Sequence, residues 1–163
     1  MIWRAWVPAK LKMFAWLLHQ NRLWCNDRLQ RRGWPNSYFC QLCLRNLETT
    51  EHLFWSCPFA KTIWASLSSW QFCQGLSIAC EYTGSNSLDM MEAMVAATQP
   101  AHAKGIKSLI MLVFWRIWQE RNSRVFRKNE ATALSVIEAI RREFRLWQQG
   151  GYKHIQSPFG DPL

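Results

Sequence analysis

Four residues in the first half of the chain have the types and the spacing of a metal site. A C-x2-C pair is followed after eight residues by a histidine and after four more by a third cysteine; these residues are Cys40, Cys43, His52 and Cys57. Three thiolates and one imidazole complete the tetrahedral shell that zinc prefers, and a complete shell leaves no open position for a substrate. The spacing therefore predicts a structural Zn2+ site.

The same residues have two other interpretations. The cysteines could form a disulfide or be buried free thiols, and a histidine beside Leu53 and Phe54 is often an ordinary core or surface residue. A disulfide leaves His52 without a role, whereas a zinc site uses all four residues together. The complete set therefore favours zinc.

Two helices are expected to position the second half of this site. Thr49 or Thr50 can cap a short helix that begins near Glu51. Pro58 suits the first position of the helix that follows, which leaves Cys57 at a helix N-terminus. The exposed amides and the dipole at that point favour a thiolate, which is the form that binds a metal.

Three stretches around the motif carry a resemblance to a known family. The chain opens with Ile2-Trp3-x-x-Trp6-Val7-Pro8, continues with Arg28-Leu29-Gln30-Arg31-Arg32-Gly33, and closes the motif with Glu51-His52-Leu53-x-x-x-Cys57-Pro58. Over roughly residues 2–70 this resembles the reverse transcriptase zinc-binding domain of plant LINE-type (non-LTR) retroelement proteins. The resemblance implies zinc bound through the four motif residues and a role close to nucleic acid.

Composition and charge narrow the class of protein. Of the 163 residues, 49% are hydrophobic, which argues against wholesale disorder, and no run is long and apolar enough to cross a membrane. Without a signal-peptide pattern, we expect an intracellular, reducing location, in the nucleus or cytoplasm, with Cys25, Cys73 and Cys80 as free thiols. The net charge of +9 is concentrated in two basic blocks, residues 1–34 and 101–149. Such blocks contact nucleic acid in some proteins and are simply solvated helices in others.

The pattern of apolar residues is mainly helical. We expect helices over residues 8–23, 26–32, 58–72, 88–98, 102–128 and 131–149, with Asn26 or Asp27 capping the second and Ser87 capping the fourth. The last is expected to bury Leu134, Ile137, Ile140, Phe144 and Trp147. The predicted parts are a zinc-binding domain (1–72), a linker (73–87), a helical region (88–150) and an irregular tail (151–163). The predicted fold class is mainly α, a small zinc-stapled helical module followed by a helical hairpin or bundle.

Two sets of basic residues are candidates for contact with nucleic acid. Arg28, Arg31 and Arg32 share a short helix, and Tyr38 follows it just before the zinc motif; this set could hold phosphates and stack a base. The second set lies opposite the last apolar stripe and consists of Arg141, Arg142 and Arg145. The alternative is that both helices are merely solvated and that the aromatic residues cover the zinc site.

No catalytic set is visible in the sequence. The three aspartates, Asp27, Asp89 and Asp161, are isolated, whereas two-metal polymerase or nuclease chemistry needs converging carboxylates. We therefore predict a protein that is not an enzyme and takes no small-molecule substrate: a zinc-binding, nucleic-acid-associated module derived from a retroelement polyprotein without its catalytic part. RNA or DNA is the expected partner. The alternatives are a protein-interaction module that docks through an aromatic stripe over residues 106–118, and a retroelement relic without a selected role.

Overall fold

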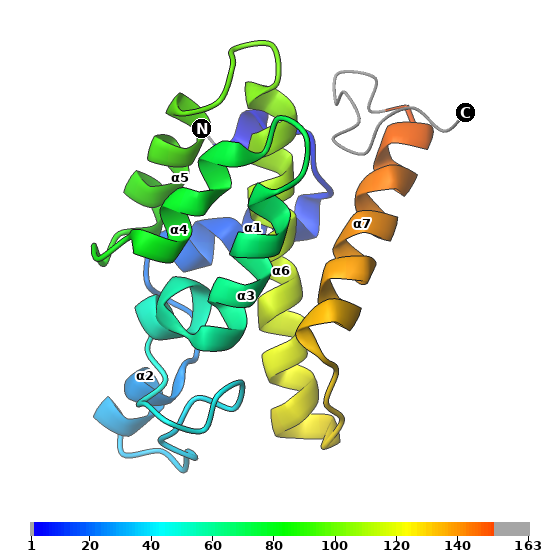
Figure 1. The fold of residues 1–163 in the computed structure, drawn as a ribbon. Helices are drawn as coiled ribbons and strands as arrows, with labels where there is room; N and C mark the ends of the chain where they lie inside the picture. The colour runs from blue at the N-terminus through cyan, green and yellow to red at the C-terminus, as the bar shows by residue number, and fades with distance from the viewer. Residues whose placement is uncertain (1, 152–163) are drawn as a thin grey trace.

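The computed structural model describes residues 2–151 and is built from helices joined by loops, the longest of which follows α2 (Figure 1). Its fold class, mainly α, confirms the prediction, and within the described residues the only β-type pairing is an isolated bridge. The main helices are α1 (Ala9–His19), α2 (Asn26–Arg31), α3 (Pro58–Ser68), α4 (Ile78–Glu81), α5 (Ser87–Ala96), α6 (Ala103–Asn122) and α7 (Ala133–Gln149). Short helical turns cover η1 (Ile2–Arg4), η2 (His52–Ser56), η3 (Gln74–Ser77) and η4 (Ser123–Arg127). Of the predicted tail, residues 151–163, all but Gly151 lie outside the described residues.

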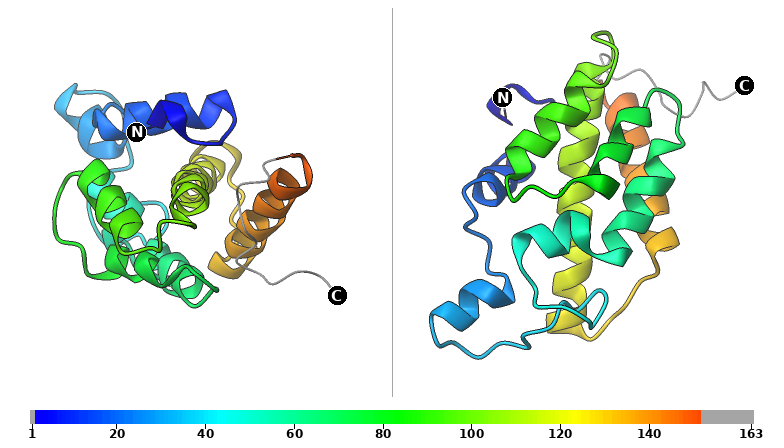
Figure 2. Two further views of the ribbon diagram at one scale, coloured as in Figure 1. Left: turned by 90° about the horizontal axis from the view of Figure 1, so that it is seen from above. Right: turned by 60° about the vertical axis from the view of Figure 1, so that its left-hand side comes forward.

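The long helix α6 forms the centre of the molecule. Seen end-on it is surrounded by the other helices, and α1, α5 and α7 pack directly on it (Figure 2). Its apolar residues occur on every side rather than along one stripe, which is the pattern of a helix buried all round. Fully buried residues of α6 include Leu109, Ile110, Met111, Leu112, Val113, Phe114 and Ile117.

This burial corrects the prediction of a docking surface over residues 106–118. Phe114 packs edge-on against Phe54 and Trp64, with ring centroids 5.6 Å apart in both pairs. Trp115 and Trp118, which are partly buried, pack around Phe14 from α1 at 5.2 and 6.3 Å. The stripe is core because α1, α3, α5 and α7 supply the partners that the sequence alone did not reveal.

Helix ends agree with the prediction in places and differ in others. Pro58 begins α3, and Gly33, at φ +67°, follows the end of α2, both as predicted. The α5 cap is Asn86, whose Oδ1 accepts from the Leu88 amide, and not Ser87. The residue that precedes α2 is Cys25, so neither Asn26 nor Asp27 is its cap.

The predicted linker has secondary structure, and one expectation about α7 needs correction. The predicted linker contains η3 and α4, and it contributes the buried side chains of Leu76 and Ala79 to a hydrophobic core that is continuous from Ala5 to Trp147. On α7 the buried stripe includes Val136, whereas Leu134 is exposed. The division into domains stays a prediction. None of the described helices combines the length and the apolarity that a membrane span requires.

Candidate metal centre

The first two cysteines lie on the turn of a short hairpin. An antiparallel bridge between Phe39 and Leu47 closes the hairpin, and the Leu44 amide donates to the Cys40 carbonyl at 2.7 Å. Leu44 has a positive φ of 56°, which bends the chain back directly after Cys43. The turn thus presents two thiols on one side.

The second two ligands come from the ends of helices. Thr49 Oγ1 accepts from the His52 amide at 2.9 Å, which is the capping contact that the sequence predicts. His52 begins the turn η2, and Cys57 stands directly before α3. A hydrogen bond from Cys40 is the main cause that lowers the pKa of Cys57. The backbone amides of Phe59 and Ala60 also donate to the Cys57 sulfur and lower its pKa further.

The four donor atoms meet at one point. All of them lie within 4.8 Å of one another, with Cys40 Sγ 3.9 Å from Cys57 Sγ and Cys43 Sγ 3.2 Å from His52 Nε2. A tetrahedral zinc with bonds of about 2.3 Å to sulfur separates two sulfurs by about 3.8 Å. Cys40, His52 and Cys57 are buried and Cys43 is partly buried. The arrangement therefore fits the closed shell of a structural zinc.

The two buried sulfurs compete for one proton. Cys40 donates to Cys57, and this hydrogen bond raises the pKa of Cys40 and lowers the pKa of Cys57. A thiol and a thiolate in this contact stabilise each other, but two thiolates at this distance would repel. A bound dication removes the repulsion and allows both sulfurs to be ligands.

The turn η4, which follows directly after α6, holds the hairpin from outside the motif. Arg124 donates to the carbonyls of Gln41 and Leu42, between the first two cysteines, at 3.1 and 3.4 Å. Glu120 Oε1 fixes the same guanidinium at 2.7 Å, and the ring of Phe59 lies 4.9 Å from it. Arg124 therefore links the hairpin to the start of α3.

A buried ion pair anchors the other end of the hairpin. Arg121 Nε contacts both carboxylate oxygens of Glu48, at 3.0 and 3.1 Å, and one terminal nitrogen lies 2.7 Å from Oε1. The exposed fractions of the two side chains are 3% and 0%. Glu48 also accepts from the Asn26 amide at 3.1 Å, which ties α2 to the same anchor. No local pattern in the sequence marks this pair, because its two members are 73 positions apart.

The two predicted basic sets lie far apart. Arg28, Arg31, Arg32 and Tyr38 surround α2, beside the hairpin, whereas the second set belongs to α7. α2 and the C-terminal half of α7 are at opposite ends of the molecule in both figures (Figures 1 and 2). The two sets therefore do not form one surface.

Each basic set also makes contacts within the protein. Arg31 pairs with Asp27 at 2.9 Å, and the guanidinium of Arg28 lies 4.3 Å from the ring centroid of Trp24. On the other side, Arg141 lies over Trp70 at 5.0 Å and 3.4 Å from Glu138.

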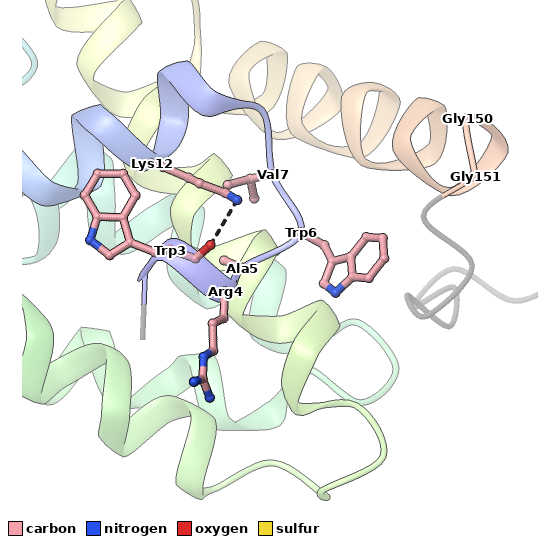
Figure 3. A pocket seen from close by; sticks show the side chains of 8 residues that line it. All are labelled: Trp3, Arg4, Ala5, Trp6, Val7, Lys12, Gly150 and Gly151. Atoms are coloured by element: carbon pink, nitrogen blue, oxygen red, sulfur yellow. Dashed lines mark hydrogen bonds between the residues drawn. The ribbon is translucent and has the colours of Figure 1, made fainter.

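A hollow near the N-terminus has a volume of about 700 Å³ (Figure 3). Trp3, Trp6 and Lys12 line it, with Gly150 and Gly151 at the end of α7. Lys12 Nζ donates to the Trp3 carbonyl at 3.1 Å. The described lining contains no carboxylate, thiol or imidazole, so it offers no metal-ligating or acid-base set.

Comparison with known proteins bears on the part of the chain that contains the cysteine and histidine cluster. Residues 1–64 match the family described as zinc-binding in reverse transcriptase. The matched zinc-binding segment includes both halves of the cluster, but it ends before Arg121 and Arg124. The broader prediction of a reverse transcriptase zinc-binding domain is supported, and the narrower origin in plant LINE-type elements stays a prediction.

A curated relative also matches part of the chain. It is a protein of Arabidopsis thaliana named "Putative ribonuclease H protein", 30% identical over 63 residues. The match covers 39% of this chain and only 10% of that protein. No solved structure matches the chain.

Proposed function

We propose that the chain is a zinc-stabilised, nucleic-acid-associated module, derived from a non-LTR reverse transcriptase polyprotein and lacking its catalytic part. The observation that carries the proposal is the convergence of four ligand atoms within 4.8 Å inside the segment that matches the zinc-binding family. Cys40, Cys43, Cys57 and His52 Nε2 would hold the ion. Bound there, zinc acts as a cross-link between the hairpin and α3.

The basic surface around α2 supports the association with nucleic acid. Arg28 and Arg31 lie on α2 beside the hairpin, Arg32 follows directly after it, and Asp27 is the only acid in that helix. Positive side chains that neutralise phosphates release counterions, which gives an affinity that falls with salt and carries little sequence preference. RNA and DNA both fit this chemistry.

The distribution of acidic residues supports a role without catalysis. Within residues 2–151, the zinc-type cluster is the only grouping of three or more His, Cys, Asp or Glu side chains close enough to share a metal ion. Two-metal phosphoryl transfer requires carboxylates that converge on two ions. Docking of a protein through residues 106–118 is not retained as an alternative, because that stripe is core.

The proposal is tested by metal analysis followed by titration with nucleic acid. We expect one zinc per chain. We also expect the protein to bind a mixed-sequence oligonucleotide with an affinity that falls strongly between about 50 and 200 mM salt, because salt opposes the release of counterions. A triple variant, Arg28→Ala, Arg31→Ala and Arg32→Ala, should keep its zinc and reduce the salt slope by up to about one unit per lost phosphate contact. A folded protein without zinc would refute the metal site.

The charge-matched comparison is a triple variant of α7, with Arg141→Ala, Arg142→Ala and Arg145→Ala. It removes the same charge from the opposite end of the molecule. If this variant loses the salt-dependent binding and the α2 variant keeps it, the interface belongs to α7. If the unmodified protein does not bind the oligonucleotide even at low salt, about 50 mM, the nucleic-acid role is refuted.

A further inference from the structure

Four aromatic side chains between residues 24 and 39 are unusually exposed. Trp24, Trp34, Tyr38 and Phe39 have exposed fractions of 40, 49, 42 and 47%. Aromatic rings gain most from burial, so a local cluster of exposed rings marks a surface that contacts something else. The cluster lies around α2 and the segment that leads into the hairpin.

The two tryptophans form a stack that arginine side chains extend. The rings of Trp24 and Trp34 lie 5.0 Å apart with an interplanar angle of 26°. The guanidinium of Arg28 lies 4.3 Å from the centroid of Trp24, and that of Arg32 lies 5.8 Å from it. Two cations therefore lie beside a pair of stacked rings on one surface, and within the described residues neither arginine has an ion-pair partner.

The backbone fixes this stack in place. Gly33, at φ +67°, reverses the chain after α2, and the Trp34 amide donates to the Leu29 carbonyl at 3.0 Å. Asn26 Nδ2 then holds the returning segment through Ser37 Oγ at 2.9 Å and the Phe39 carbonyl at 3.1 Å. Rings that are already positioned lose little freedom when a ligand binds.

We infer that this surface binds single-stranded nucleic acid, with an unpaired base stacked on the exposed ring of Trp34 and neighbouring phosphates on Arg28 and Arg32. This rests on the proposed nucleic-acid association and names the form of nucleic acid. An exposed ring face needs a free base face, which a single strand offers and a duplex hides within its own stacking. The positive charge of the surface favours an anionic polymer over an apolar protein partner.

The test compares three labelled probes on the zinc-loaded full chain. These are oligo-dT, oligo-rU and a mixed-sequence duplex of equal length, each titrated by fluorescence anisotropy at one salt concentration. We expect the single strands to bind about tenfold or more tightly than the duplex. Trp34→Ala should weaken single-strand binding about tenfold, because one base stack contributes of that order, and should leave duplex binding within about twofold.

Two substitutions at the same position separate stacking from packing. Trp34→Phe keeps an aromatic face and should bind single strands within about threefold of the unmodified protein. Trp34→Leu keeps an apolar side chain without a ring and should bind as weakly as Trp34→Ala. The matched control is Trp3→Ala, which removes a ring that is 56% exposed, on η1 at the other end of the molecule. This control should change nothing.

The possible results separate the inference of single-strand binding from the broader proposal of nucleic-acid association. Equal affinity for single strands and duplex, or single-strand binding that survives both Trp34→Ala and Trp34→Leu, overturns the inference and leaves a purely electrostatic association. No binding of any probe by the unmodified protein overturns both. If the protein binds oligo-rU more tightly than oligo-dT, the preferred single strand is RNA. Equal affinities for the two probes indicate that the protein contacts only the bases and phosphates.

Discussion

At the scale of single residues, the cysteines divide into two groups with different chemistry. Burial raises the pKa of Cys25 and of Cys73 to about 12, so both are protonated and unreactive at neutral pH. The three cysteines of the metal centre lie in a segment that zinc is expected to hold folded, so removal of the metal should unfold that segment and expose them. Alkylation of the native protein should therefore spare them, and a chelator should make Cys40, Cys43 and Cys57 reactive while Cys73 stays protected, as read by peptide mass spectrometry. Equal labelling with and without the chelator would contradict zinc ligation.

Loss of one ligand should have a large local effect. We expect Cys40→Ser or His52→Ala to lose the zinc and to unfold residues 34–60, because structural zinc contributes on the order of 10 kcal/mol to small modules at neutral pH. Metal analysis and amide hydrogen exchange measure the two effects. Cys80→Ser, a partly buried cysteine outside the cluster, is the control and should retain the metal. Native metal content in either ligand variant would show that the assignment is wrong.

A single histidine should make stability depend on pH. His19 Nδ1 lies 2.7 Å from Ser87 Oγ between α1 and α5, and burial lowers the pKa of His19 from 6.5 to about 4. His19 binds a proton more readily in the unfolded chain than in the folded one. Its contribution to the free energy of unfolding is therefore complete above pH 6.5 and is lost as the pH falls toward 4. After discounting for partial exposure, its size is about 2 kcal/mol.

The measurement is the free energy of unfolding as a function of pH, for the unmodified protein and for His19→Asn. Zinc release in acid affects both proteins equally, so the difference between the two curves isolates His19. We expect His19→Asn to flatten the curve between pH 6.5 and 4, the interval between the unfolded and folded pKa values. Parallel curves would mean that His19 is solvated in the folded protein.

At the scale of elements, the junction between α6 and the hairpin depends on one buried ion pair. Arg121→Met leaves the Glu48 carboxylate buried without its partner, and we expect a loss of about 3–5 kcal/mol in urea unfolding. The double variant Arg121→Met with Glu48→Gln should recover part of this loss. Arg31→Ala, which breaks an exposed pair with Asp27, is the control and should cost less than about 1 kcal/mol. Additive effects of Arg121→Met and Glu48→Gln would refute the coupling.

Local patterns predicted the elements well and their contacts poorly. The zinc-type spacing, the turn at Gly33 and the start of α3 at Pro58 each depend on residues a few positions apart, and the sequence carries that information directly. The pair Arg121–Glu48 and the stack of Trp24 on Trp34 depend on how the chain returns to itself, which no short pattern encodes. The apolar residues on all sides of α6 were the one available sign that it is buried.

At the scale of the whole molecule, the core does not stop where the family match stops. The buried cluster runs from Ala5 to Trp147, whereas the match covers residues 1–64. We expect a fragment of residues 1–72 to bind zinc but to expose apolar surface, with increased dye binding and a broad thermal transition. The full chain should unfold in one transition. A fragment that folds cooperatively with the hydrogen-exchange pattern of the full chain would support the predicted separate domain.

The distance along the chain between Glu48 and its partner also orders events during synthesis. All four ligand atoms of the metal centre belong to residues 40–57, but Arg121 is translated 73 residues after Glu48. At a ribosomal rate of about 5–20 residues per second, the hairpin waits roughly 4–15 seconds for that arginine. The nascent chain can therefore bind its metal while Glu48 is still hydrated. The ion pair between Arg121 and Glu48 then forms around a metal site that already holds its ion.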